Sequence, residues 1–501
     1  GVIVPLLCLG LSMVWVLGGC AMLGIELHPM ALLFPLVLGL VSMGYSAMIM
    51  AEYYRLFKET GDKNASISGA FSRTSLIAAM VILGLVSAVM CLVPVPMFQG
   101  MGYAGIIWMV GGFGFIVLGL PLMISLFPEP KEANGQVEPE TGARSGSSHA
   151  WILLGFALVI GLGCFSATKL NVGDNVPGYD YISEGHPWAE CFSIFSEKFM
   201  GPRQLLVYVE ADAPGGLLEP EAMNAIGAFS RFLRNEGGAT DSIGFDMMVC
   251  MTRGMLMDAN PKWQTVPVTR DKIFGMSGMV MEEGGAEAFM GPKYTRAVIS
   301  PFFPKQDTAA INAYASSMQT YIDTHPYEHC RFSLGGGLLG MTKVLNDTTR
   351  HVYPVIIAAS FLVLLVLGAM VSGSLITGVL VAIPVAAAQA LLWIMMLVFQ
   401  MKIGLPMVGV APVALGFGAM FGLYACTGGS SVSRGTLAWT GGLVFAASLP
   451  WFFIGMRFQG SMMMFFGMMV VFENLCALGF MPVWKSWSDI HSNENNGGIY
   501  G

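Results

Sequence analysis

Long apolar stretches without any Asp, Glu, Lys or Arg dominate this chain; 353–371 and 375–400 are two of them. An α-helix rises about 1.5 Å per residue, so each stretch can cross a hydrocarbon core about 30 Å thick. Only 11% of the 501 residues are charged, against about 25% in an ordinary soluble domain. The sequence therefore predicts a polytopic α-helical membrane protein and excludes a soluble globule and a disordered chain. The net charge of -7 also argues against nucleic acid as a partner.

Hydropathy predicts ten membrane spans in three groups. The spans are 2–25, 30–52, 74–97 and 103–127, then 151–169, and finally 353–371, 375–400, 406–427, 436–456 and 460–483. A linker at 128–150, rich in Pro, Glu, Gly and Ser, separates the first two groups and is expected to be flexible and solvated. A polar block at 170–350 separates the last two, and a polar tail follows at 484–501.

The positive residues of the short loops predict the orientation of the spans. Eight Lys and Arg fall on one side of the membrane, whereas only Lys402 and Arg457 fall on the other. Positive residues accumulate in cytoplasmic loops. The linker and the tail are therefore predicted to be cytoplasmic, and 170–350 to face the periplasm or the cell exterior.

The block at 170–350 has the pattern of an α+β domain. Its residues favour strands at 204–210, 294–300 and 330–334 and helices at 219–236 and 307–324, which is typical of helices packed on one face of a sheet. The run Gly335-Gly-Gly337 predicts a tight turn from the last strand into a helix.

The first four spans and the last four resemble each other in sequence. Pro35 and Gly39 align with Pro412 and Gly416 at one constant spacing. This repeat predicts two helix bundles of the same orientation, at 1–127 and 351–483. Parallel repeats usually place the working site at their interface near the bilayer midplane.

The second repeat is preceded by a span, an exterior block and another span. A complete first repeat would have the same elements upstream of Gly1, so we expect the chain to lack its natural N-terminus. In this layout, and in the run Gly335-Gly-Gly-Leu-Leu-Gly340 before a helix, the sequence resembles the resistance–nodulation–division (RND) superfamily. Within that superfamily it is most similar to the mycobacterial-membrane-protein-large (MMPL)-like transporters.

The resemblance implies a fold, a location and a function. It implies an inner-membrane protein of two six-span halves, the second opening with 151–169, and a periplasmic porter-like domain at 170–350. The implied function is export or relocation of a hydrophobic or amphiphilic substrate such as a lipid. Implied partners are that substrate, the membrane, and either a periplasmic protein or further copies of the chain.

The chain departs from the superfamily where relatives carry an acid in the fourth span of each half, typically Gly-x-x-x-Asp. The matching stretches are Gly39-Leu-Val-Ser-Met43 and Gly416-Phe-Gly-Ala-Met420. Both Asp positions are methionine, which leaves open whether transport is coupled to protons. Gly39 and Gly416 fit either close helix packing or a relay.

Among the acidic residues, Glu473 is the one deep inside a span. Its possible partners are Asn474 and, on the preceding span, Thr436 and Thr440. One interpretation is a displaced proton or ion site, and the other is a neutral, hydrogen-bonded glutamic acid in a helix interface. Glu52, at the end of a span, is predicted to be an interfacial charge.

The 38 methionines allow a metal interpretation, because thioethers suit Cu(I) and some members of the superfamily export such metals. Methionine is also adaptable apolar filler, and we predict filler, with no metal site and no cofactor. The sequence has no His-Glu-x-x-His or Gly-x-Ser-x-Gly motif, so an enzyme is not expected. The alternative function is a non-transporting sensor or assembly partner that keeps the fold without coupling.

Overall fold

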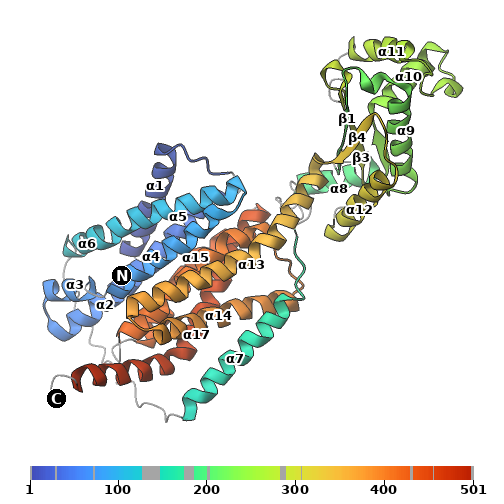
Figure 1. Ribbon diagram of the computed structural model, residues 1–501. Coiled ribbons are helices and arrows are strands. Elements are labelled where there is room, and N and C mark those ends of the chain that lie inside the picture. Colours follow the sequence, from blue (N-terminus) through green and yellow to red (C-terminus); the bar gives the residue numbers. More distant parts are fainter. Residues whose placement is uncertain are drawn as a thin grey trace. The chain divides into compact units, whose positions relative to one another are not determined.

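The computed structural model (Figure 1) describes ten stretches of the chain. These are residues 3–28, 31–71, 74–126, 147–173, 186–199, 203–282, 289–305, 307–428, 433–454 and 456–497. The linker predicted at 128–150 lies outside them, apart from residues that begin a helix at 147. The chain divides into two compact units, Gly1–Val172 with Thr349–Gly501, and Gly173–Thr348.

The first unit consists of helices. Before the linker these are α1 (Ile3–Met22), α2 (Phe34–Thr60), α3 (Lys63–Phe71), α4 (Thr74–Ala88), α5 (Pro96–Gly114) and α6 (Leu120–Leu126). After it come α7 (Ser147–Ala167), α13 (Gly337–Ser372, which begins in the second unit), α14 (Leu375–Val398), α15 (Leu405–Gly428), α16 (Arg434–Ser448) and α17 (Arg457–Gly497).

Within the described residues, nine helices are long and apolar enough to cross a membrane, with α5 and α6 forming one of them at Pro96–Leu126. The remaining predicted span, 74–97, consists of α4 followed by a 3₁₀ segment at Val89–Leu92. Together these two segments are about 30 Å long. The chain is thus a polytopic helical membrane protein with an additional α+β domain.

In the helical unit, helices of one repeat pack against helices of the other repeat. Helix α2 packs on α16 of the other repeat, and its equivalent α15 packs on α4, the equivalent of α16. Buried residues make up 94% of the apolar window of α2 and 100% of that of α15, against 33% for α1. Helices α2 and α15 are therefore the central helices of the bundle.

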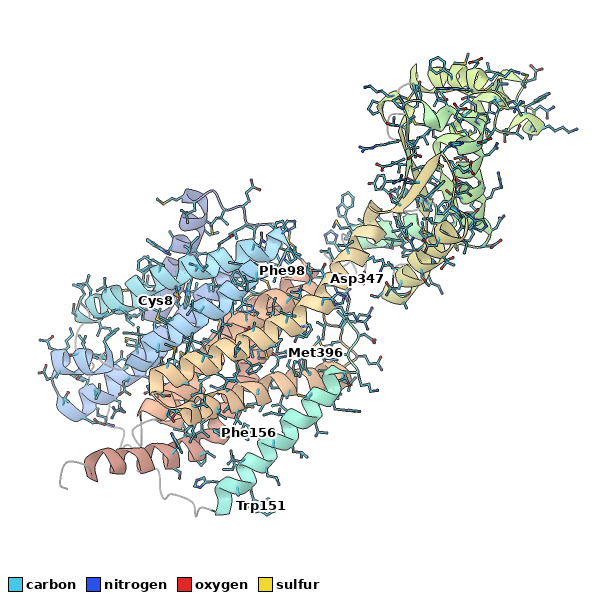
Figure 2. All side chains as sticks on the ribbon, viewed as in Figure 1. Cys8, Phe98, Trp151, Phe156, Asp347 and Met396 are labelled. Atoms are coloured by element: carbon cyan, nitrogen blue, oxygen red, sulfur yellow. The ribbon has the colours of Figure 1, made fainter. Side chains whose placement is uncertain are left out.

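Helix α7 lies at the edge of the same unit. Figure 2 labels two of its aromatic side chains, Trp151 and Phe156. Trp151 is exposed, whereas Phe156 packs edge to face on Phe480 of α17 with ring centroids 5.0 Å apart. An exposed aromatic side chain on a membrane helix is suited to contact with lipid.

The second unit contains a four-stranded sheet and six helices. Its elements are α8 (Pro187–Lys198), β1 (Val207–Ala211), α9 (Pro220–Asn235), β2 (Asp241–Ile243), α10 (Phe245–Leu256), α11 (Arg270–Glu282), β3 (Arg296–Phe302), α12 (Thr308–Thr324), β4 (Cys330–Leu334) and the start of α13. The strand order is β2-β3-β1-β4, and β1 is antiparallel to both β3 and β4. Each β-α-β unit is thus split by a strand of the other, which is a ferredoxin-like arrangement.

Alternation along the strands positions the core of this unit. Val207 and Val209 of β1 and Ile299 of β3 are fully buried together with Ile226 and Phe229 of α9. The period of two residues on the strands and the apolar stripe on the helix place these side chains on facing surfaces. The α+β class predicted for this block is confirmed, while β2, α8, α10 and α11 were not predicted.

The glycine turn after β4 has the backbone geometry that its sequence predicts. Gly336 and Gly337 have φ values of +83° and +71°, a left-handed region that favours glycine. A Cβ atom on Gly337 would also lie 2.6 Å from the carbonyl oxygen of Gln204. The turn therefore needs glycine for its backbone conformation and for its close approach to the backbone of Gln204.

We expect Gly337→Ala to destabilise the second unit by at least about 1–2 kcal/mol, the cost of a left-handed non-glycine residue. Gly335→Ala is the matched control, because its new Cβ would meet only the Tyr208 ring at 3.5 Å. Limited proteolysis of the detergent-solubilised chain over a urea series measures both variants. Equal shifts of the two midpoints would contradict the prediction.

Candidate functional site

The two methionines at the positions where the resemblance predicts acids lie inside the helix bundle. Met43 of α2 and Met420 of α15 are both 0% exposed, so neither side chain faces lipid. They sit on the two central helices, one in each repeat.

The equivalent glycines Gly39 and Gly416 both permit close helix contacts, but with different neighbours. A Cβ on Gly39 would lie 3.1 Å from the carbonyl oxygen of Leu9 on α1, within the same repeat. A Cβ on Gly416 would lie 2.9 Å from Cα of Leu83 on α4, in the other repeat. Small residues allow such backbone approach in lipid. The packing interpretation of both glycines therefore has direct support.

A satisfied polar cluster lies beside Met43 in the first repeat. The hydroxyl of Ser42 accepts hydrogen bonds from Ser12 Oγ of α1 and from Trp108 Nε1 of α5, both at 2.7 Å. It donates to the carbonyl oxygen of Leu38 at 3.1 Å. The cluster joins three helices with neutral groups, and its hydrogen-bonding capacity is used within the bundle.

The buried carboxyl of Glu473 lies on α17 and is 2% exposed. Within the described part of the chain, neither of its oxygens has a hydrogen-bond partner. It faces α15 at Gly418, where a Cβ would fall 2.6 Å from Cδ of Glu473. A glycine at position 418 thus makes room for the carboxyl, two residues from Met420 along the chain.

Two of the predicted partners of Glu473, Asn474 and Thr440, are engaged elsewhere. Asn474 Nδ2 donates to the carbonyl oxygen of Leu437 on α16 at 2.6 Å, and its side chain packs against Gly441. Thr440 Oγ1 donates to the carbonyl oxygen of Thr436 in its own helix at 2.9 Å. Adjacent residues of a helix point about 100° apart. Glu473 therefore faces α15, whereas Asn474 faces α16.

A carboxyl buried without a hydrogen-bond partner is unfavourable in both of its protonation states. Burial of an ionised carboxylate without a partner is costly, and a neutral carboxyl without a hydrogen bond also loses free energy. The interpretation of Glu473 as a hydrogen-bonded structural residue does not match this geometry. Its interpretation as a displaced proton or ion site stays a prediction.

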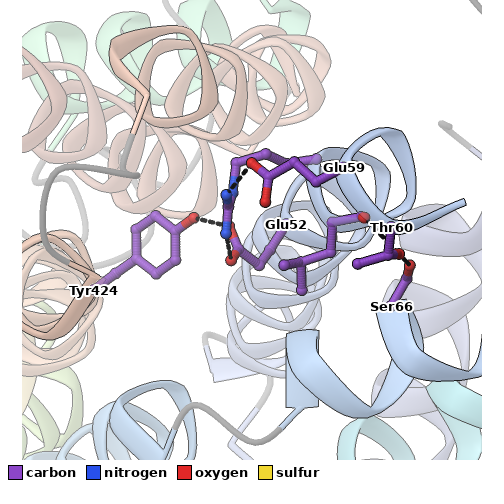
Figure 3. A network of polar contacts seen from close by, with 7 residues as sticks. Glu52, Glu59, Thr60, Ser66 and Tyr424 are labelled. Atoms are coloured by element: carbon purple, nitrogen blue, oxygen red, sulfur yellow. Dashed lines mark hydrogen bonds and ion pairs between the residues drawn. The ribbon is translucent and has the colours of Figure 1, made fainter. Parts of the chain in front are cut away.

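Glu52 is not the interfacial charge that the sequence predicts, because it is 1% exposed. Arg55 pairs with both of its oxygens, with Nη2–Oε1 at 2.7 Å and Nε–Oε2 at 3.1 Å. Tyr424 of α15 donates its hydroxyl to Oε2 at 2.8 Å (Figure 3). The three-residue spacing of Glu52 and Arg55 was a signal for the ion pair. No local pattern signals Tyr424, which is 372 residues away along the chain.

Among the described residues of the second unit, His329 lies near one acidic side chain. His329 Nε2 lies 3.5 Å from Glu221 Oε2 on an exposed surface. Across the residues that the structure describes, no group of three or more His, Cys, Asp or Glu side chains is arranged to hold a metal ion.

The chain resembles known proteins in its fold rather than in its sequence. No protein-family model matches the chain, and no curated protein matches its sequence. Among solved structures, the fold is similar to that of the hedgehog release protein Disp from the water bear Hypsibius dujardini, with a TM-score of 0.56 and 12% sequence identity. The match covers 95% of this chain and 66% of that chain. At this identity the likeness shows the fold alone.

We expect Asn474→Leu to lower the stability of the helical unit by about 1 kcal/mol, because it removes one interhelical hydrogen bond. Glu473→Gln should keep or raise the stability, since neither carboxyl oxygen has a partner among the described residues. Thermal unfolding in one detergent measures both variants. A loss in Glu473→Gln as large as that in Asn474→Leu would identify Glu473 as a structural hydrogen-bonding group.

Proposed function

We propose that this chain belongs to an MMPL-like transporter of the inner membrane that exports or relocates a hydrophobic or amphiphilic molecule such as a lipid. The observation that carries the proposal is the packing between the repeats, in which α2 lies against α16 and α15 lies against α4. Such an interface lets two bundles rock against each other around a central site. The similar protein is named for a release function, which supports export.

The surfaces at this interface are shaped for movement of one bundle against the other. Gly44 of α2 lies against the ring of Phe417 on α15, and a Cβ there would fall 2.6 Å from the ring. Contacts made by small residues depend on van der Waals packing rather than on directional bonds. In the proposed mechanism the domain Gly173–Thr348 receives the substrate or passes it on.

In this mechanism Glu473 takes over the role that acids on α2 and α15 have in relatives. Its carboxyl faces α15 at Gly418, close in sequence to the methionine that replaces the usual Asp. A proton bound or released at Glu473 changes the cost of burying that carboxyl. This change in free energy would alter the packing of α17 against α15, one of the two central helices.

We expect Glu473→Gln to reduce transport driven by a pH gradient by at least about tenfold, equivalent to about 1.4 kcal/mol. The measurement is redistribution of a fluorescent phospholipid in proteoliposomes with an imposed pH gradient. Glu26→Gln is the matched control, because Glu26 is an exposed carboxyl that follows α1. Normal gradient-driven transport by Glu473→Gln would remove the role assigned to Glu473.

The buried methionines favour a second candidate, a sensor or assembly partner that keeps the fold without transport. Met43 and Met420 fill both positions with apolar, fully buried side chains. The same proteoliposomes distinguish the two candidates. The second is supported if the natural chain moves no amphiphile while the double variant Met43→Asp/Met420→Asp does so in a gradient-dependent manner.

A further inference from the structure

We infer that Glu52 and Tyr424 form a latch that holds the equivalent helices α2 and α15 together and opens when the two repeats rock. The inference rests on the proposed rocking motion, but the latch itself is defined by side-chain geometry. The hydroxyl of Tyr424 donates to Glu52 Oε2 at 2.8 Å, and both side chains are 1% exposed. Figure 3 shows the Tyr424 ring reaching from α15 toward the carboxyl on α2.

The latch lies at a distance from another close contact between the two helices. Gly44 of α2 touches Phe417 of α15, eight residues before Glu52. Eight helical residues correspond to about 12 Å. A rotation of about 10° around the Gly44–Phe417 contact would move the helix ends by about 2 Å, which lengthens a 2.8 Å hydrogen bond beyond the usual limit. The glycine contact thus acts as a pivot, and the tyrosine bond responds to the rotation.

Arg55 makes this bond reversible. It holds both oxygens of Glu52 from the same helix, at 2.7 and 3.1 Å, and it also pairs with Glu59 at 2.5 Å. When Tyr424 leaves, the buried carboxylate keeps its counter-charge. Opening the latch therefore avoids the large cost of an unpaired buried charge.

The repeat does not supply a second, symmetry-equivalent latch. At the spacing that aligns Gly39 with Gly416, the positions equivalent to Glu52 and Tyr424 are Gly429 and Ala47. Neither side chain can form a second bond of this kind. A single hydrogen bond on one side of a pseudo-symmetric pair favours one of the two states of a rocking motion over the other.

Cys426 provides a native reporter for this end of α15, because it lies two residues after Tyr424 and is only partly buried. In lipid nanodiscs, Tyr424→Phe removes the hydroxyl alone, and we expect maleimide labelling of Cys426 to become roughly 3- to 10-fold faster. Peptide-resolved mass spectrometry separates Cys426 from the other eight cysteines. Tyr54→Phe is the control, since Tyr54 lies on α2 and is 39% exposed.

Two results would overturn the latch. One is an unchanged labelling rate at Cys426 in Tyr424→Phe, and the other is an equal acceleration at Cys8, which is buried in α1 and would report general loosening. Acceleration confined to Cys426 supports the latch. The labelling needs no substrate, so it stands apart from the proteoliposome assay that decides whether the chain transports.

Discussion

The close approach of the two repeats depends on residues that have no side chain. Gly416 brings α15 against the backbone of α4, and Gly44 brings α2 against Phe417. Lipid tails are as apolar as leucine, so helices in a membrane associate through packing and hydrogen bonds rather than through exclusion of water. The central burial of α2 and α15 follows from these contacts. The positions of Met43, Met420 and Tyr424 follow in turn.

The buried carboxyl of Glu473 lies on α17 rather than on α2 or α15, where the resemblance predicts acids, yet it faces α15. Met420 occupies the position on α15 where the resemblance predicts Asp, while Glu473 on α17 contacts α15 at Gly418. The carboxyl is thus one helix away from the position that the resemblance predicts, and it still adjoins α15. Under the proposed function, charge at this interface would change the packing of α15 from outside rather than from within.

The sequence predicts features that depend on local pattern and fails where distant segments meet. Spans and the strand at 330–334 are local, because hydropathy and alternation are read from neighbouring residues. Strand β2 has three residues, Asp241–Ile243, too few for a period to appear. The burial of Glu52 depends on Tyr424, far away in the chain. The partners of Asn474 depend on which helix each side of α17 faces. Glu473 and Asn474 are adjacent in sequence, yet they face α15 and α16 respectively.

Helix α15 contacts both polar features discussed above, the buried carboxyl of Glu473 and the hydrogen bond between Glu52 and Tyr424. It faces the unpartnered carboxyl of Glu473 at Gly418 and holds Glu52 through Tyr424. These two positions are six residues apart, or about 9 Å along one helix. A helix segment of this length moves as a rigid element, so a shift of α15 at Gly418 also displaces the Tyr424 hydroxyl. In the proposed mechanism a change of charge at Glu473 and the opening of the latch are therefore linked through a single helix.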